Sequence, residues 1–206
     1  KEANDTCNID AGKNQGYWIT VRSAQTQAAG KYTGKVSVTS DGGEREIPVS
    51  VEVWDFALPV KSSMQTNFLH HWNNNYYEDV GISSKEMNRM VWEFFLDYRI
   101  SGNYMFFIEY DGYGADLENY VKSMKEFVDE HPEITHVQLL LHQWDYSGTV
   151  DSEAMANNKN NKYMYELLKK YGLTQIASYY VVDEPADTEA NEKLIKDLAA
   201  GISGFA

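Results

Sequence analysis

The sequence predicts an α/β protein whose first part is all-β and whose remainder alternates strands with helices. From about residue 17 to residue 56, apolar and polar side chains alternate with period two between glycine-rich turns, as in antiparallel strands with one buried face. After about residue 60, short apolar runs alternate with segments of helical period, which favours parallel strands buried on both faces. We therefore expect two domains, 1–60 and 61–206.

The first domain is expected to contribute three strands. These are Tyr17–Val21, Lys35–Thr39 and Ile47–Trp54, with a turn at Asp41–Gly43 and a loop over residues 1–16. Pro48 lacks an N–H for a sheet ladder, which favours an edge position. Three strands cannot close a sandwich, so we expect the C-terminal part of an antiparallel β-sandwich, followed by a junction at 57–63.

The second domain is expected to hold about four strand–helix units. The predicted strands are Met64–Leu69, Tyr104–Ile108, His136–Leu141 and Ser178–Val182. The predicted helices are Ser83–Ile100, a segment with Leu117, Tyr120, Val121, Met124, Phe127 and Val128 on one face, Tyr163–Tyr171, and a last helix capped by Asp187. The first of these helices would bury Met87, Met90, Val91, Phe94, Phe95 and Tyr98, and Ser83 with Glu86 forms a capping-box pattern at its start.

A (β/α) barrel is favoured over a doubly wound sheet. The first strand runs into the bulky polar stretch His70–Tyr77, where a doubly wound fold usually has a glycine-rich phosphate turn. Eight units need roughly 250 residues, so four units predict an incomplete TIM-type barrel, its N-terminal half. At the cut edges we expect exposed apolar surface, or a partner chain, oligomer or domain swap that covers it.

Composition excludes several classes of function. The net charge is −13 without a basic cluster, so a nucleic-acid partner is not expected. No apolar run approaches the roughly 18 residues of a membrane span. Cys7 is the only cysteine, so neither an internal disulfide nor a thiolate metal site can form. The start at Lys1, without methionine or signal-type segment, predicts a cleavage boundary, and we expect an exported protein of the periplasm or cell surface.

The residues that follow the predicted strands are the candidate binding residues, because barrel active sites lie at the C-terminal ends of the strands. All four ends carry acids, histidines or aromatic rings, which together predict a polar, aromatic pocket that suits a sugar. The candidate substrate-binding residues are His70, Trp72, Tyr110, Asp111, His142, Trp144, Asp145 and Tyr180.

Asp183, Glu184 and Pro185 form the sharpest motif, directly after an apolar run. Two adjacent carboxylates near apolar walls disfavour double ionisation, so one can remain a general acid while the other stays charged. Acids before a helix can also serve as caps, but Asp187 is already placed to cap the last helix. Asp183 and Glu184 are therefore the candidate catalytic pair.

A metal site is an alternative to this interpretation. His70 and His71 could join His142 and Asp183 as ligands, but adjacent residues on a strand point to opposite faces. The sequence has no phosphate loop, zinc helix motif or Gly-x-Ser-x-Gly elbow. We expect neither a metal nor a cofactor.

Three passages resemble a known family. They are Ala29–Val36, the passage Ile47–Pro59, and Val181–Pro185 with its Asp-Glu-Pro motif. Together they resemble glycoside hydrolase family 123 and its uncharacterised relatives, in a match that covers most of the chain from about residue 17. The resemblance implies a β-sandwich joined to a (β/α)8 barrel, and β-N-acetylgalactosaminidase activity, the activity of the characterised members.

The resemblance also implies roles for the acid pair in substrate-assisted retaining hydrolysis. Asp183 would stabilise the substrate's 2-acetamido group as it attacks the anomeric carbon, and Glu184 would protonate the leaving oxygen and then activate water. Two alternatives remain open. A barrel glycosidase of the Asn-Glu-Pro type would use Glu184 as acid/base with a nucleophilic Glu from a later strand, and a degenerate barrel would bind glycan without cleaving it.

Overall fold

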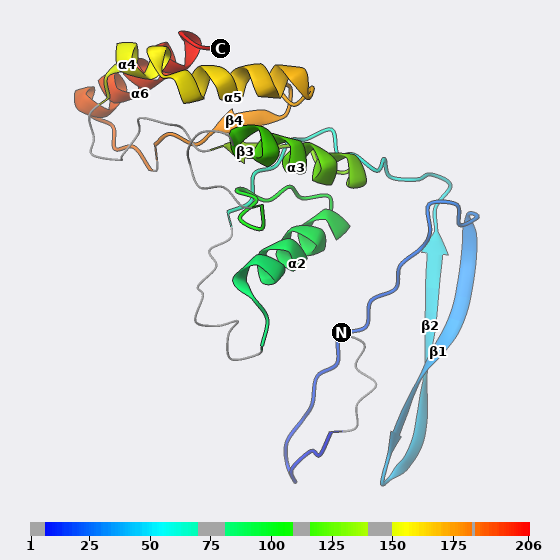
Figure 1. The fold of residues 1–206 in the computed structure, drawn as a ribbon. Helices are drawn as coiled ribbons and strands as arrows, with labels where there is room; N and C mark the ends of the chain where they lie inside the picture. The colour runs from blue at the N-terminus through cyan, green and yellow to red at the C-terminus, as the bar shows by residue number, and fades with distance from the viewer. Residues whose placement is uncertain (1–6, 70–80, 109–115, 140–149, 183) are drawn as a thin grey trace. The chain divides into compact units, whose positions relative to one another are not determined.

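A computed structural model describes residues 7–69, 81–108, 116–139, 150–182 and 184–206 (Figure 1). The chain is an α/β protein that divides into two compact units, Lys1–Leu58 and Pro59–Ala206. Each unit is described by itself. Among the described residues the sheets are small and no barrel closes, so the sandwich and the half barrel stay predictions.

The first unit contains an antiparallel hairpin of β1 (Gly30–Ser40) and β2 (Gly43–Val53). The chain turns after Ser40, as predicted, and Gly43 has a φ of 107°, which suits a residue without a Cβ. The register pairs Val36 with Ile47, and Lys35 forms an ion pair with Glu46 across the strands. One face of the hairpin is therefore apolar and the other polar.

The predicted strand Tyr17–Val21 is not a strand in the structure. Its side chains are exposed, with Trp18 almost entirely so. Period-two alternation provides a strand with a buried face only where a neighbouring strand supplies backbone hydrogen bonds, and the described residues supply none for this stretch. The hairpin's apolar side chains Val38 and Ile47 are also exposed.

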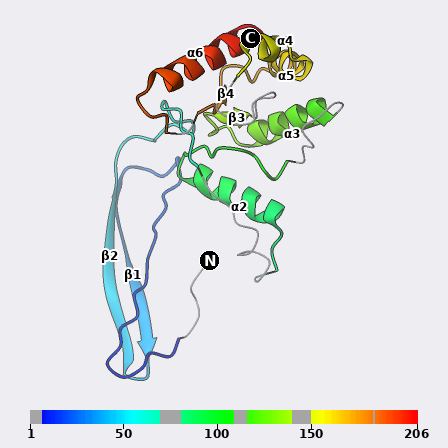
Figure 2. The same cartoon turned by 90° about the vertical axis from the view of Figure 1, so that its left-hand side faces the viewer.

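The second unit places its predicted strands in parallel pairs. Phe68 pairs with Gly102 in a parallel bridge, and β3 (Val137–Leu139) pairs in parallel with β4 (Ala177–Tyr179). Figures 1 and 2 show β3 and β4 side by side, near α3 and α5. The described parts of the predicted first, third and fourth runs thus carry β pairing, over shorter lengths than predicted.

The predicted strand Tyr104–Ile108 is wrong. The chain makes its bridge two residues earlier, at Gly102, and then turns. The Tyr104 carbonyl accepts a hydrogen bond from the indole of Trp92 instead of a neighbouring strand, and Ile108 N–H donates to the Met105 carbonyl at 3.0 Å. These two bonds occupy groups that a strand would need for its ladder.

Five helices are described in the second unit. They are α2 (Ser84–Asp97), α3 (Asp116–Glu130), α4 (Ser152–Asn157), α5 (Lys159–Lys170) and α6 (Glu189–Ser203). The cap at Ser83 is confirmed, because its hydroxyl accepts the Glu86 N–H at 3.2 Å. In the described part of the chain, no helix has both the length and the apolar character needed to cross a membrane.

Two helix predictions need correction. The cap of α6 is Thr188, whose hydroxyl accepts the Asn191 N–H, and not Asp187. The short helix α4 was not predicted, because its six residues are too few for a helical period to show. Asn158 both ends α4 and caps α5, where its side-chain oxygen accepts the Asn160 N–H. α5 therefore begins at Lys159 rather than at Tyr163.

The apolar core lies between α2, α3, α5 and β3. On α3 the predicted face is confirmed, since five of its six members are buried: Leu117, Tyr120, Val121, Met124 and Phe127. On α2 the predicted face is half right. Met87, Val91 and Phe95 are half-buried beside the buried Asn88, Trp92 and Leu96, whereas Met90, Phe94 and Tyr98 are exposed. α2 is apolar around most of its circumference, and the large indole occupies the space beside Gly102, where a Cβ would come within 2.9 Å of it.

Candidate functional site

The parallel pairing of β3 and β4 fixes one edge at which the candidate site would lie. Leu139 is in register with Tyr179, so both strands end at the same edge, and the chain beyond β4 leads to Glu184. Phe68 and Gly102 also pair with each other in parallel, in an isolated bridge. Parallel strands deliver the residues that follow them to a common edge, which is where α/β proteins bind ligands.

Glu184 has an unusual backbone conformation. Its φ is 40°, a region that residues with a side chain rarely adopt, and it precedes Pro185, which further restricts it. Arg99 also has a positive φ, but it follows the end of α2, where helices commonly place such a residue. Glu184 follows a strand, and Thr188 caps the next helix. Its strain, of order 1–3 kcal/mol, therefore has no helix-capping explanation.

The surroundings of Glu184 differ from the apolar walls expected from the sequence. Glu184 is exposed, and β4 is only half-buried, because β3 is its one paired neighbour among the described residues. Tyr180, the other predicted residue that the structure describes, is 41% exposed. The remaining predicted residues lie outside the described residues: Asp183, His70, Trp72, Tyr110, Asp111, His142, Trp144 and Asp145. His71, a candidate ligand of the alternative metal site, also lies outside the described residues.

A set of polar side chains that the sequence analysis missed faces away from the helices. At Gly102, a Cβ would lie 2.9 Å from the Trp92 ring, so this residue faces α2. Successive side chains of an extended chain point to opposite sides. Ser101 and Asn103 therefore point away from α2, and both are buried.

The same alternation holds on β3 and β4. Val137 and Leu139 belong to the apolar core with the helices, so His136 and Gln138 point to the other side. Ser178 is in register with Gln138 and shares its face. His136 and Gln138 are buried, while Ser178 is exposed.

Asn67, next to the paired residue Phe68, completes this set of polar side chains. Phe68 packs edge-on against Phe95 of α2, with 5.6 Å between ring centroids, so the preceding Asn67 points away from α2. We call the resulting set the polar face. It consists of Asn67, Ser101, Asn103, His136, Gln138 and Ser178.

Hydrogen bonds join the polar face across segments that are far apart in the sequence. The Asn67 side-chain amide donates to Gln138 Oε1 at 2.5 Å. His136 Nε2 and Ser178 Oγ, on neighbouring strands, are also 2.5 Å apart. Ser101 Oγ lies 3.1 Å from Thr135 Oγ1 and accepts the Thr135 N–H. The polar face therefore draws on all four segments that carry parallel pairing, around Phe68, Gly102, β3 and β4.

Burial lowers the pKa of the His136 imidazole below its usual value of about 6.5. The folded protein favours neutral His136, whereas the unfolded chain binds a proton as pH falls below about 6.5. The contribution of neutral His136 to the free energy of unfolding is therefore full above that pH. It is lost as the pH falls toward the pKa of His136 in the folded protein. Each unit of lowering corresponds to about 1.4 kcal/mol.

We expect the thermal midpoint of the wild-type protein to fall as the pH is lowered from about 7.5 to about 5.5. The thermal midpoint of His136→Gln should fall less over the same interval. Calorimetry of both proteins measures the difference. Gln keeps a hydrogen-bonding group toward Ser178 but does not titrate. If the two proteins lose equal stability, His136 is not the group responsible.

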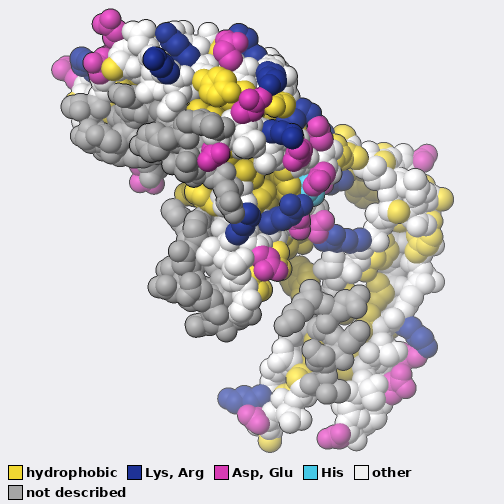
Figure 3. Space-filling view, in the orientation of Figure 1, with side chains coloured by type: hydrophobic (Ala, Val, Ile, Leu, Met, Phe, Trp, Pro, Cys, Tyr) yellow, Lys and Arg dark blue, Asp and Glu magenta, His cyan; other side chains and the backbone are white. Residues whose placement is uncertain are grey.

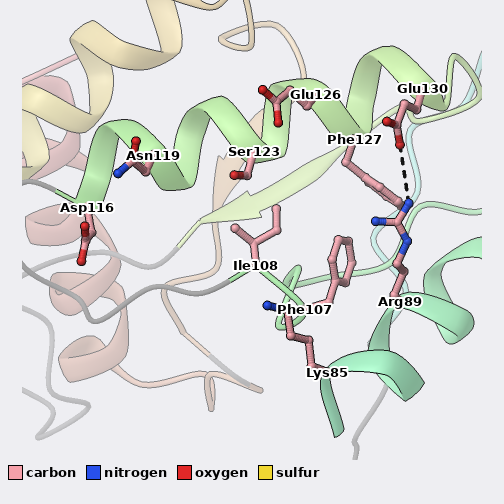
Figure 4. A pocket seen from close by; sticks show the side chains of 10 residues that line it. All are labelled: Lys85, Arg89, Phe107, Ile108, Asp116, Asn119, Ser123, Glu126, Phe127 and Glu130. Atoms are coloured by element: carbon pink, nitrogen blue, oxygen red, sulfur yellow. Dashed lines mark ion pairs between the residues drawn. The ribbon is translucent and has the colours of Figure 1, made fainter. Parts of the chain in front are cut away.

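A cavity of about 570 Å³ lies elsewhere, between α2 and α3 (Figure 4). Lys85 and Arg89 are the cations among its lining residues. The guanidinium lies 2.9 Å from Glu93 and 3.5 Å from Glu130, and it stacks 5.3 Å from the centre of the Phe127 ring. Figure 3 shows basic and acidic side chains interspersed on the face of the second unit seen there. Because Arg89 is already neutralised, we assign this cavity a structural role; neither Tyr180 nor Glu184 lines it.

No family model matches the sequence, and a search of curated proteins finds no match.

Proposed function

We propose that this protein is a glycoside hydrolase, a retaining exo-β-N-acetylhexosaminidase that favours N-acetylgalactosamine. Glu184 is the acid/base, and Asp183 stabilises the 2-acetamido group of the substrate, which serves as the nucleophile. The fold that goes with this proposal is the N-terminal half of a (β/α)8 barrel after the end of a β-sandwich.

The observation that carries the proposal is the conformation of Glu184. It is a carboxylate in a strained backbone conformation, five residues beyond the end of a parallel strand. Strained residues persist where surrounding structure holds them, and they cluster at functional sites. The C-terminal edge of parallel strands is the place where α/β enzymes carry catalytic groups.

The adjacency of Asp183 and Glu184 in the sequence favours a mechanism in which the substrate's own acetamido group is the nucleophile. A two-carboxylate retaining enzyme holds its acid/base and its nucleophile about 5–5.5 Å apart on opposite sides of the bond. Neighbouring residues of one strand end cannot easily flank a glycosidic bond in this way. An acetamido oxygen that attacks the anomeric carbon removes the need for a protein nucleophile.

Exposed apolar side chains support the half-barrel interpretation. Met90, Phe94 and Tyr98 form a stripe on α2 at a spacing of four residues, opposite the buried stripe with Trp92. In a closed barrel each helix packs against two neighbouring helices. A further strand–helix unit beside α2 would bury this stripe.

A glycan-binding protein without catalysis is the second candidate. The exposure of Glu184 favours it, because enzymes generally hold their catalytic groups in sites that exclude water. The hydrogen-bonding groups of the polar face would serve binding alone equally well.

Turnover of chromogenic substrates by the full-length protein separates the candidates. We expect release of nitrophenol from 4-nitrophenyl N-acetyl-β-galactosaminide and much less from 4-nitrophenyl β-galactoside, which lacks the acetamido nucleophile. Equal turnover of both would favour the Asn-Glu-Pro type of mechanism. Sugar binding without turnover of any β-glycoside would favour the glycan-binding candidate and reject the enzyme.

A further inference from the structure

The polar face lacks the residues that usually fill such a position. Side chains on the inward face of parallel strands in barrels are mostly bulky and branched, such as Val, Ile and Leu. Here Asn67, Asn103, His136, Gln138 and Ser178 replace them, and none carries an acidic or a permanently cationic group. The helix-facing positions of the same strands, such as Val137 and Leu139, follow the ordinary apolar pattern.

Two polar atoms of this face are buried without a hydrogen-bond partner among the described residues. They are Asn103 Oδ1 and His136 Nδ1. Asn103 is 2% exposed and His136 is 7% exposed. Leaving such atoms unpaired destabilises a fold, and native proteins rarely tolerate it without a reason. An apolar residue of similar size would avoid this cost.

We propose that the polar face is a binding surface for a neutral polyhydroxylated ligand, a sugar ring with its hydroxyl and acetamido groups. The choice of sugar rests on the proposed function. Amide, hydroxyl and imidazole groups supply both hydrogen-bond donors and acceptors. A sugar hydroxyl can use both, because it donates one hydrogen bond and accepts others. The ligand's hydroxyl groups satisfy Asn103 Oδ1 and His136 Nδ1.

The charge of the face excludes anionic ligands from this role. Phosphates and carboxylates are usually held by Arg, Lys or helix N-termini. The polar face has no Arg or Lys, and burial keeps His136 neutral near pH 7. Asn67 and Ser178 are exposed, and the exposed Tyr180 lies two residues beyond Ser178, just past the end of β4. These exposed residues offer a ligand access from solvent and one aromatic surface.

Equilibrium binding tests this inference separately from hydrolysis. In the Glu184→Gln protein, which does not consume ligand, we expect N-acetylgalactosamine to shift the NMR signals of the His136 imidazole and of the Asn67 and Gln138 amides. Galactose 6-phosphate should bind more weakly. The absence of any shift at saturating millimolar sugar overturns the inference, whether or not the wild type hydrolyses glycosides.

Substitutions separate binding from a structural role. Asn103→Leu removes an unpaired buried oxygen, so it should weaken sugar binding about tenfold or more while leaving the thermal midpoint unchanged or higher. Asn119→Leu makes the same chemical change at an exposed position of α3 and should leave binding within about twofold. If Asn103→Leu lowers the thermal midpoint and retains the wild-type affinity, the residue is structural and the inference fails. If that variant does not fold, the titration of Glu184→Gln decides alone.

Discussion

Replacing Glu184 by glutamine should lower kcat on N-acetyl-β-galactosaminides with weakly acidic alcohol leaving groups about 10²–10⁴-fold, the range for loss of a general acid. Glutamine keeps the size of the side chain and cannot donate the proton that the leaving oxygen needs. The loss should be smaller for substrates whose leaving group is acidic, because such groups depart with less protonation. Steady-state kinetics across leaving groups of different pKa measures both effects in the full-length protein.

Two further variants locate the effect. Asp183→Asn should lower kcat more for acetamido sugars than for plain hexosides, because its proposed partner is the acetamido group. Glu189→Gln, in the first turn of α6, removes a nearby exposed carboxylate that has no proposed catalytic role and should leave kcat within about twofold. Near-wild-type activity of Glu184→Gln would remove Glu184 from the mechanism.

Local signals in the sequence predicted the helices best. The Ser83 cap and the buried face of α3 follow from short-range chemistry, in which a hydroxyl meets an N–H and apolar residues recur every three or four positions. The face of α2 could not be predicted in this way. It carries apolar residues around most of its surface, and the position of Trp92 against Gly102 depends on the pairing of the segment after the helix with Phe68.

Strands were harder to predict because their pairing is not local. The run Tyr104–Ile108 is as apolar as a strand, but the Trp92 indole takes the carbonyl of Tyr104. Tyr17–Val21 alternates like a strand and lacks a described neighbour to pair with. In both cases tertiary contacts, which the pattern does not contain, decide the conformation.

The candidate site could be predicted in part. Residues after strand ends are readable from the sequence, and they led to Glu184. The polar face went unnoticed because its members lie inside or beside apolar runs. A signal was present in the sequence, since polar residues recur with period two in Ser101-Gly102-Asn103 and in His136-Val137-Gln138. That period indicates a strand with one polar side.

Replacing Trp92 by alanine should destabilise the protein by about 3–5 kcal/mol, the cost of removing a large buried aromatic residue. Its side chain is 0% exposed and packs edge-on against Phe107 and Phe127, and its indole N–H donates to the Tyr104 carbonyl. The variant loses these contacts and leaves that carbonyl without its partner. Denaturant unfolding followed by circular dichroism measures the change in the free energy of unfolding.

Phe94→Ala is the matched control, an aromatic-to-alanine change two residues away on α2. Phe94 is 58% exposed, so its loss should cost less than about 1 kcal/mol. Both variants gain the helix propensity of alanine, so this effect cancels in the comparison. Trp92 also lies against Gly102, which pairs with Phe68. Its loss should therefore loosen the Phe68–Gly102 bridge, an effect that helix packing alone would not predict. Equal costs for the two variants would show that the indole is not buried between α2 and the strands.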